Sequence, residues 1–525
     1  MQHPRDLAVA FSLANLCYLR VWSEILTYTR SDTYLMKTPP VPAEYAAAVT
    51  NVLLAGALFW GLTTMARRFL PKGAFGFVEM GFLVTLAVPL NALRSVLAND
   101  FSYLRSPLFE VIGTRGVAAL AGALGLGGLT VVVFFHHRAA RVAAAGLAIA
   151  SPFCAITFGQ AIWKAAHYDD RAYADKPSAA PVAGVKRFPR VVWIICDEWD
   201  YRLTFIDRDR TLALPEIDRL RREAVYAENA FPPGPETPVS IPGYYTGRLV
   251  SGVEYQGPRL LGVKFQGESG LVPWSAQPNY FGRARDLGFN TALVEWFHPT
   301  CRVLDGLTFC RWWEMAMQHN SMGDGFGQIL RNQTRSLFES NLFSVLGRAL
   351  THDQQTATYG AILRTGEAVA NQTDYSFTVV HLPIPHAPNA YDRRTGQFTL
   401  GNAPIRGYVD SLALLDRTIG ELRRSMESAG TWDKSTVLFT SDHPYREAES
   451  LDGKSDPRIP YLLKVASQGG AYSQPVAYNQ PVVYTQPFNA VLTGDLLLAV
   501  LRGEVGSASE AAGWLDRNRG RFPTQ

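Results

Sequence analysis

The stretch VVWIICDE, residues 191–198, joins a run of six apolar residues to two carboxylates. An uninterrupted apolar run of this length is typical of a strand buried on both faces of a parallel sheet. Four later runs have the same character: TALVEW (291–296), SFTVVHL (376–382), STVLFT (435–440) and IPYLLKV (459–465). Apolar residues at helical spacing lie between them, notably in 214–224 and 405–430. This alternation predicts an α/β domain over 191–525 with a doubly wound, mostly parallel sheet.

Carboxylates and an imidazole follow two of these predicted strands. Asp197 and Glu198 end the first run, and Ser441, Asp442 and His443 follow STVLFT. Ligands of such sheets lie beyond the carboxyl ends of the strands, and these side chains suit a divalent ion such as Zn, Mn, Mg or Ca. Capping of the following helix explains either group alone, but both groups together favour a metal site. We expect Asp197, Glu198 or both to bind the metal together with Asp442 and His443.

A segment rich in hydroxyl groups supplies a candidate nucleophile. The stretch TPVSIPGYYTG, residues 237–247, places Thr237 and Ser240 at the start of a predicted helix. A hydroxyl at such a position, with amide groups and a metal nearby, can be activated for attack. The alternative is that Thr237 only caps the helix before Pro238.

The first 163 residues differ in composition from the rest. The chain of 525 residues is 47% hydrophobic and 18% charged, below the ~25% of charged residues in typical soluble domains. Five apolar segments are about as long as a helix needs to cross ~30 Å of hydrocarbon. They are 7–26, 45–65, 75–93, 116–135 and 142–163. They predict an α-helical membrane domain of about five spans over 1–163, followed by a polar linker over 164–190.

Basic residues in two short loops predict the orientation of these spans. The loops contain Arg67, Arg68 and Lys72 in one case, and Arg138 and Arg141 in the other. Positively charged loops stay on the cytoplasmic side, so everything after residue 163 is expected to be exported. The same conclusion holds for four spans, if residues 7–26 do not cross the membrane.

Two cysteines are candidates for a disulfide, and the net charge bears on the class of partner. Cys301 and Cys310 lie on the expected exported side, close enough in sequence to close a small loop. An oxidising compartment favours a disulfide between them, and two free thiols are the alternative. The net charge of +4, without a dense basic patch, gives no reason to expect a nucleic-acid partner.

The segment TPVSIPGYYTG resembles the active-site signature of the sulfatases and of the wider alkaline phosphatase superfamily. Thr237 falls on the nucleophile position, with Ser240 three residues later and Gly247 ten residues later. Residues 406–443 look like the long helix, strand and Ser-Asp-His signature of the same superfamily. The resemblance implies the same fold for the C-terminal domain.

Two further segments extend this resemblance in the family order. PHAP at 385–388 is similar to a Pro-His-x-Pro substrate motif, which places His386 near the transferred group. Residues 452–465, with Lys454 and Arg458, resemble the segment that closes the site. The matches together cover about 191–465.

Thr237 indicates one branch of the superfamily. Sulfatases of the usual type convert Cys or Ser at this position to formylglycine, and Thr cannot supply that aldehyde. Thr here resembles the membrane-bound branch, the lipoteichoic acid synthases and phosphoethanolamine transferases, which look like five helices before an extracytoplasmic catalytic domain. Pro444 replaces the family's Gly after the Asp-His pair, and no histidine follows His443. The resemblance therefore implies one metal ion.

The resemblance also implies a mechanism. The metal would lower the pKa of the Thr237 hydroxyl, which would attack a phosphodiester in line and form a phosphothreonine. His386, Lys454 and His381 would stabilise the developing negative charge, with Ser240 and Arg458 also in the substrate-binding set. A hydrogen-bonded core position is the alternative for His381, because it lies on a predicted buried strand.

The expected function is that of a membrane-anchored phosphotransferase or phosphodiesterase of a bacterial inner membrane, with a periplasmic or extracellular catalytic domain. Its partners would be the membrane, a phospholipid donor and an envelope glycan or lipid acceptor. The alternatives are a sulfuric ester hydrolase and a catalytically silent protein that binds the envelope.

Overall fold

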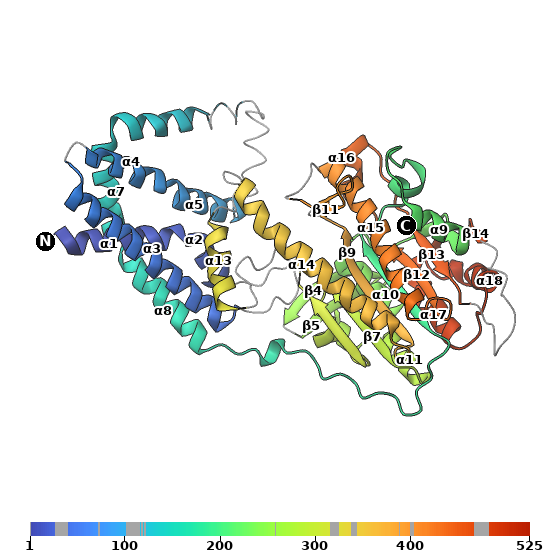
Figure 1. The fold of residues 1–525 in the computed structure, drawn as a ribbon. Coiled ribbons are helices and arrows are strands. Elements are labelled where there is room, and N and C mark those ends of the chain that lie inside the picture. The colour runs from blue at the N-terminus through green and yellow to red at the C-terminus, as the bar shows by residue number, and fades with distance from the viewer. Residues whose placement is uncertain are drawn as a thin grey trace. The chain divides into compact units, whose positions relative to one another are not determined.

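The chain forms two compact units (Figure 1). The computed structural model describes residues 2–26, 40–71, 74–100, 116, 119, 122–257, 259–314, 325–337, 344–387, 389–399, 404–466 and 482–524. The first unit gathers the described residues within Met1–Thr29, Thr38–Asp170 and His319–Thr351. The second gathers those within Arg171–Gln318 and His352–Gln525.

The first unit is helical. Its helices are α1 (Gln2–Cys17), α2 (Leu19–Leu26), α3 (Pro42–Phe69), α4 (Phe75–Thr85), α5 (Ala87–Asp100), α7 (His136–Ala150), α8 (Pro152–Ala166) and α13 (Phe326–Ser336). A small apolar core of residues such as Leu13, Val52 and Leu147 lies where α1, α3 and α7 meet. Many large apolar side chains on the outside of these helices are exposed, for example Leu54, Phe77 and Ile149. Exposed apolar surface of this extent suits a lipid environment better than water.

The described helices include two to four candidate membrane spans by length and composition. Pro42–Phe69 and Phe75–Leu93 qualify as they stand. Two bent pairs qualify together: Pro4–Cys17 with Leu19–Leu26, bent by 60°, and Gly122–Phe134 with His136–Ala150, bent by 102°. The expected segment 142–163 is divided between α7 and α8, because Pro152 begins a new helix after Ser151. The expected segment 116–135 lies partly outside the described residues, and the count of about five spans remains a prediction.

Helix α13 belongs to the first unit although it comes late in the sequence. The Nδ2 atom of Asn51 donates to Oε1 of Gln333 at 3.1 Å, and Nε2 of Gln333 donates to the carbonyl of Glu44 at 2.9 Å. The hydroxyls of Tyr18 and Thr334 lie 3.1 Å apart. The sequence predicts one C-terminal domain over all of 191–525, whereas the structure packs this helix in the first unit.

The second unit is built on an eight-stranded sheet in the order β14-β2-β13-β12-β1-β9-β7-β8. In chain order these strands are β1 (Val191–Asp197), β2 (Val225–Ala227), β7 (Thr291–Trp296), β8 (Phe309–Trp313), β9 (Phe377–Pro385), β12 (Thr436–Ser441), β13 (Tyr461–Lys464) and β14 (Val482–Tyr484). Strand β1 pairs in parallel with both β9 and β12, whereas β13 runs antiparallel to β12 and β2. The predicted α/β domain with a mostly parallel sheet is confirmed.

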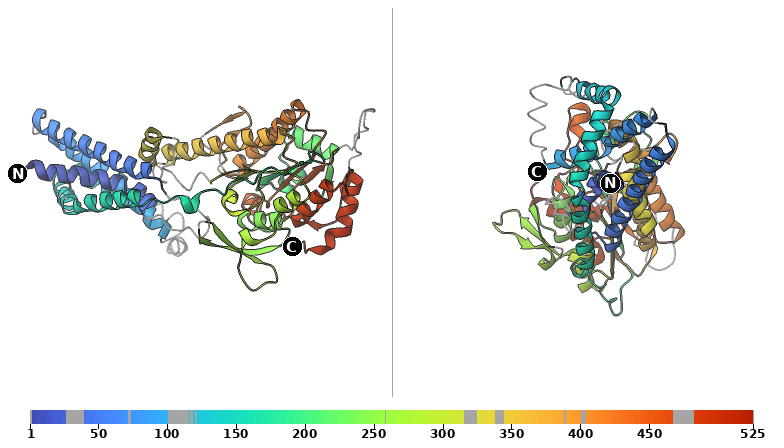
Figure 2. Two further views of the ribbon diagram at one scale, coloured as in Figure 1. Left: turned by 90° about the horizontal axis from the view of Figure 1, so that it is seen from below. Right: turned by 90° about the vertical axis from the view of Figure 1, so that its left-hand side faces the viewer.

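Helices cover both faces of this sheet (Figures 1 and 2). They are α9 (Pro215–Glu223), α10 (Thr237–Thr246), α11 (Tyr280–Asp286), α12 (Thr300–Val303), α14 (Ser344–Asn371), α15 (Pro404–Ser428), α16 (Ala448–Asp452), α17 (Thr493–Leu501) and α18 (Ala508–Asn518). Alternate residues of β1 enter two separate cores: Trp193 contributes to the core with α10, α11 and α17, and Ile194 to the core with α9, α14 and α15. Because successive strand residues face opposite sides, a strand buried on both faces must be apolar throughout, as this one is.

Short strands complete the unit. They are β3 (Ala230–Phe231), β4 (Val250–Gly257), β5 (Leu260–Phe265), β6 (Val272–Pro273), β10 (Tyr391–Asp392), β11 (Gln397–Phe398) and β15 (Phe488–Asn489). The parallel strands β1, β9 and β12 end at the same edge of the main sheet. That edge holds the candidate site.

Candidate active site

Thr237 begins helix α10 at the carboxyl edge of the sheet. Glu236 before it is extended, with φ −155° and ψ 155°, and Pro238 follows in the first turn, where its fixed φ favours helix initiation. The helix ends at Gly247, whose φ of +68° is a left-handed conformation that favours glycine. Thr237 is only 4% exposed, so its hydroxyl is held inside the site.

Three polar side chains surround this hydroxyl. Oγ1 of Thr237 donates a hydrogen bond to Oδ2 of Asp442 at 2.7 Å. Oδ1 of Asp197 lies 3.4 Å from the same oxygen, and Nε2 of His443 lies 3.2 Å from it. The sequence predicted these four residues as nucleophile and metal ligands, and the structure brings all four together.

Asp197, Asp442 and His443 form a group that could hold a metal ion. One candidate ligand atom from each lies within 4.8 Å of the others. Nε2 of His443 is 3.5 Å from Oδ1 of Asp197 and 3.4 Å from Oδ2 of Asp442, and all three side chains are fully buried. The second carboxylate oxygen of Asp197 has no hydrogen-bond partner among the described residues.

The buried negative charge of this group favours the binding of a cation. Burial raises the pKa of Asp197 well above its ordinary value, and the adjacent Asp442 carboxylate raises it further. Burial also acts to raise the pKa of Asp442, but the positive charge available on His443 and His381 outweighs it, and the net shift is downward. Two buried carboxylates side by side are costly unless paired or bound to a metal. Hard oxygen ligands with one imidazole fit a divalent ion.

Glu198 follows Asp197 in the sequence, but its carboxylate pairs with an arginine. Its backbone φ of 63° is left-handed, which is uncommon for a residue with a side chain. Its carboxylate accepts a hydrogen bond from Nε of Arg446 at 2.6 Å. Among the described residues, the metal-type group contains Asp197 but not Glu198. A ligand role for Glu198 remains a prediction.

The chain belongs to the sulfatase family. The family model described as Sulfatase matches residues 189–481, more than half of the chain. Enzymes of the wider superfamily bind a divalent metal, which agrees with the buried Asp/Asp/His group. The family assignment supports an enzymatic function. None of the curated proteins matches the chain.

Several solved structures are similar to this sulfatase-family chain. The phosphonate monoester hydrolase of Agrobacterium radiobacter is 15% identical, with a TM-score of 0.39, over 60% of this chain and 77% of that chain. The PsFucS1 sulfatase from Pseudoalteromonas sp. is 14% identical, with a TM-score of 0.40, over 60% of this chain and 68% of that chain. A protein of the alkaline phosphatase superfamily from Vibrio parahaemolyticus is 12% identical, with a TM-score of 0.37, over 64% of this chain and 71% of that chain.

The predicted substrate histidines of the sulfatase-family domain lie on and after β9. The backbone N–H of His386 donates to the carbonyl of Asp197 at 3.2 Å, and its Nε2 accepts from Nη2 of Arg446 at 3.1 Å. Burial lowers the pKa of His386. His381 is fully buried and its Nδ1 bonds to Glu295, as expected of a core histidine, while its Nε2 has no partner among the described residues.

Three other predicted substrate residues have partners outside the group around Thr237. Oγ of Ser240 donates to the carbonyl of Gly234 at 2.9 Å. Nζ of Lys454 lies 3.3 Å from Asp207 and is largely exposed. Arg458 pairs with Asp456 and stacks over the ring of Tyr201 at 4.4 Å. Their substrate roles remain predictions.

Two residues that the sequence analysis did not name also belong to this region. Arg446 connects Glu198 to His386, and it follows the Ser-Asp-His signature by three residues. His298 follows β7 and is fully buried, with neither ring nitrogen hydrogen-bonded among the described residues. Burial lowers its pKa to about 3, and the nearby His381 adds to the shift. Since ligands gather beyond strand ends, the position of His298 after TALVEW was the available signal.

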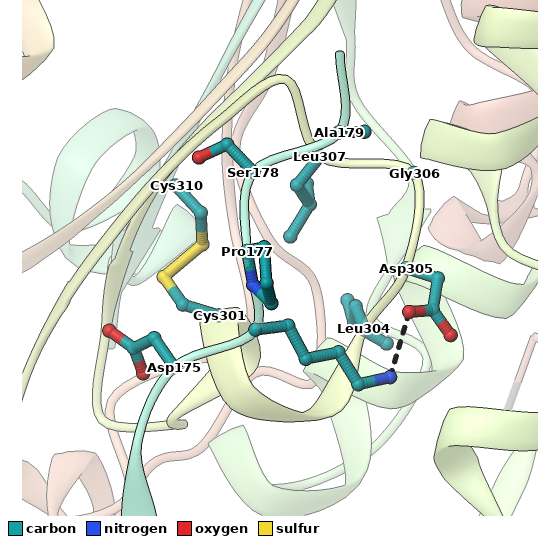
Figure 3. A pocket seen from close by; sticks show the side chains of 11 residues that line it. Asp175, Pro177, Ser178, Ala179, Cys301, Leu304, Asp305, Gly306, Leu307 and Cys310 are labelled. Carbon is teal, nitrogen blue, oxygen red and sulfur yellow. Dashed lines mark hydrogen bonds and ion pairs between the residues drawn. A yellow bond between two sulfur atoms is a disulfide. The ribbon is translucent and has the colours of Figure 1, made fainter.

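Cys301 and Cys310 form a disulfide in the sulfatase-family domain (Figure 3). Their Cα atoms are 5.5 Å apart, and they line a cavity of about 100 Å³ beside residues 175–179 of the expected linker. The backbone N–H of Lys176 donates to the carbonyl of Cys301 at 3.0 Å, and its Nζ pairs with Asp305 at 2.9 Å. The disulfide loop therefore holds part of the linker against the domain.

Proposed function

We propose that this sulfatase-family chain is a membrane-anchored, metal-dependent phosphotransferase or phosphodiesterase that uses Thr237 as its nucleophile. The observation that carries this proposal is the 2.7 Å hydrogen bond from Oγ1 of Thr237 to Oδ2 of Asp442, within the buried group that fits a divalent ion. A hydroxyl with a carboxylate acceptor on one side and an imidazole nitrogen on the other is positioned for deprotonation.

Asp197, Asp442 and His443 would hold the metal, which is Zn, Mn, Mg or Ca in this proposal. When bound, a divalent ion supplies Lewis-acid chemistry that lowers the pKa of a nearby hydroxyl and offsets negative charge on a phosphoryl group. The Thr237 hydroxyl, whose pKa the bound ion would lower, gives up its proton to solvent. Its oxygen then forms a bond to phosphorus, the bond from phosphorus to the donor alcohol breaks, and that alcohol leaves with a proton from solvent.

The product of this first step is a phosphothreonine. In the second step an acceptor hydroxyl attacks phosphorus and loses its proton to solvent. The bond from phosphorus to Oγ1 of Thr237 breaks, and Thr237 takes up a proton from solvent. Water as acceptor makes the enzyme a hydrolase. In this proposal His381, whose Nδ1 is held by Glu295, would donate from Nε2 to an equatorial oxygen, and His386 would do so after Arg446 releases its Nε2. One well-placed donor contributes about 3 kcal/mol in comparable sites.

Thr237 also favours phosphoryl over sulfuryl chemistry. The formylglycine of sulfatases arises from Cys or Ser, so a Thr nucleophile attacks directly. A sulfuric ester hydrolase is the second candidate, because the family model is that of the sulfatases. A catalytically silent binding protein would be expected to lack part of the site, whereas Thr237, Asp197, Asp442 and His443 are all present and adjacent.

The helices of the first unit support a lipid substrate. Two or more of them are long and apolar enough to span a bilayer. Together with the basic loops, they favour a bacterial inner membrane and a periplasmic or extracellular catalytic domain. The proposed donor is therefore a phospholipid headgroup, and the acceptor is an envelope glycan or lipid.

The test is to trap the covalent intermediate. The full chain, solubilised in detergent, is incubated with headgroup-labelled phospholipids and Mn or Zn, and its peptides are examined by mass spectrometry. We expect a phospho-adduct on Thr237 that is absent from Thr237→Ala. The matched control is Thr246→Ala, at the other end of α10, where the hydroxyl donates to the carbonyl of Pro242 at 2.7 Å and has no other partner in the part of the chain that the structure describes. An adduct that persists in Thr237→Ala refutes the assignment, and turnover of an aryl sulfate without any adduct favours the sulfatase alternative.

A further inference from the structure

A cavity of about 240 Å³ lies in the first unit, lined by α1, α3, α4 and α7. This volume is a little below the ~300–1,000 Å³ typical of sites that enclose a whole ligand, so it can hold part of one. It does not involve the residues around Thr237, and the proposed function leaves it unexplained.

The cavity is charged at one end and apolar along its walls. Arg5 lies at the start of α1, and Arg67 near the end of α3. Eight residues separate Arg5 from Leu13, so the wall formed by α1 runs ~12 Å from the charged end. Phe59 and Phe82 form other parts of the apolar wall. A ligand that matches this cavity has a charged head and an apolar tail.

The charged end favours an anion. Asp6 is paired with Arg67, and Glu79 is paired with His137, so both carboxylates of the lining already have partners. Arg5 has no hydrogen bond or ion pair among the residues that the structure describes, and its side chain is exposed. Its guanidinium is available to a ligand.

Arg141 supplies a second available guanidinium. Its only hydrogen bond among the described residues joins Nε to the carbonyl of His137 at 3.1 Å, which leaves both terminal nitrogens open. Two guanidinium groups that line one cavity suit a phosphate, because each can bind two of its oxygens in parallel.

We propose that this cavity binds an anionic phospholipid, with the phosphate between Arg5 and Arg141 and an acyl chain along the apolar walls. Basic pockets between membrane helices bind acidic headgroups in this way. The basic segments that predict the cytoplasmic side include Arg67 and Arg141, so the charged end of the cavity is expected to face the cytoplasmic leaflet. Anionic lipids of that leaflet are attracted to basic side chains. The site is separate from the proposed substrate site and does not depend on catalytic activity.

The test is competitive lipid retention by the full chain in detergent, measured by native mass spectrometry. The probes are phosphatidylglycerol and phosphatidylcholine of identical acyl chains in equal amounts. We expect the chain to retain phosphatidylglycerol about tenfold better, and the double variant Arg5→Ala/Arg141→Ala to lose this preference. Arg138→Ala, which removes an exposed guanidinium of α7 outside the cavity lining, should behave as the wild type.

Two further measurements separate a lipid site from a site for free phosphate. Ala144→Phe fills the apolar wall without changing any charge, and we expect it to reduce phosphatidylglycerol retention as strongly as the double arginine variant. Millimolar inorganic phosphate should not displace the retained lipid. Equal retention of the two lipids by the wild type, unchanged retention by the double variant, or displacement by inorganic phosphate overturns the proposal.

Discussion

Nε of Arg446 lies 2.6 Å from Oε1 of Glu198. The same guanidinium reaches Nε2 of His386 through its Nη2 at 3.1 Å, so one arginine joins a predicted metal ligand to a predicted substrate residue. The carboxylate of Glu198 is therefore neutralised by an arginine, whereas that of Asp197 lies beside Asp442 and His443.

This arrangement predicts different outcomes for the two neighbouring acids. Asp197→Asn removes a charged ligand from the buried group, and we expect the purified chain to lose most of its bound metal. Glu198→Gln breaks the pair with Arg446 but leaves the group of Asp197, Asp442 and His443 intact, so the metal content should remain close to one ion per chain. Elemental analysis of both variants provides the measurement. Loss of metal from Glu198→Gln would show that its carboxylate turns from Arg446 to the metal.

Substitutions at Thr237 test the role of its hydroxyl. Thr237→Ser keeps an oxygen beside Oδ2 of Asp442, and we expect kcat to fall by roughly tenfold as the loss of the methyl group loosens its position. Thr237→Ala removes the nucleophile and should reduce kcat by about 10³-fold or more. Turnover of a synthetic phosphodiester measures both. Comparable residual activity in the two variants would mean that a bound hydroxide, rather than Thr237, attacks the substrate.

The strands and the central site could be predicted because both depend on short stretches of sequence. An apolar run such as 191–196 is explained only by burial on both faces, and all five runs contain strands of the sheet. Asp197 and Asp442 then meet because β1 and β12 are parallel neighbours that end at the same edge. The sequence supplied the residue types, and the topology of parallel sheets supplied their proximity.

The partners of individual polar side chains could not be predicted in the same way. Lys454 is paired with Asp207, nearly 250 residues earlier in the sequence, and no local pattern identifies that partner. Arg446 lies in a turn, where no repeating pattern of residues indicates which side chains lie near it. Its bond to Glu198 is therefore visible only in the folded structure. Helix α13 has an amphipathic pattern that predicts a helix with one buried face, but the pattern does not indicate that α3 covers it.

The disulfide between Cys301 and Cys310 should stabilise the second unit. Closing a loop across nine residues of sequence separation restricts the unfolded chain by about 2–3 kcal/mol in the chain-entropy model. The variant Cys301→Ser/Cys310→Ser should therefore unfold at a temperature several degrees lower, as measured by thermal unfolding without reductant. Reductant should lower the Tm of the wild type by a similar amount and leave the double variant unchanged. Equal Tm values for the wild type with and without reductant would contradict this prediction.

His298 should make the fold sensitive to acid. Burial lowers its pKa from 6.5 to about 3, so between these values the unfolded chain binds a proton that the folded chain does not. The free energy of unfolding is therefore unaffected by this group above pH 6.5 and decreases as the pH falls from 6.5 toward 3. At pH 5 the loss is about 2 kcal/mol, because each pKa unit corresponds to about 1.4 kcal/mol.

Replacing His298 by Leu removes this proton linkage. Neither ring nitrogen has a hydrogen-bond partner among the described residues, so removing the ring breaks no side-chain hydrogen bond there. We expect the Tm of His298→Leu to fall less than that of the wild type between pH 7 and pH 5. His167→Leu, which changes an exposed histidine at the end of α8, is the control and should keep the wild-type slope. Identical slopes for the wild type and His298→Leu would mean that the buried imidazole gains a proton without cost to the fold, and that the acid sensitivity has another origin.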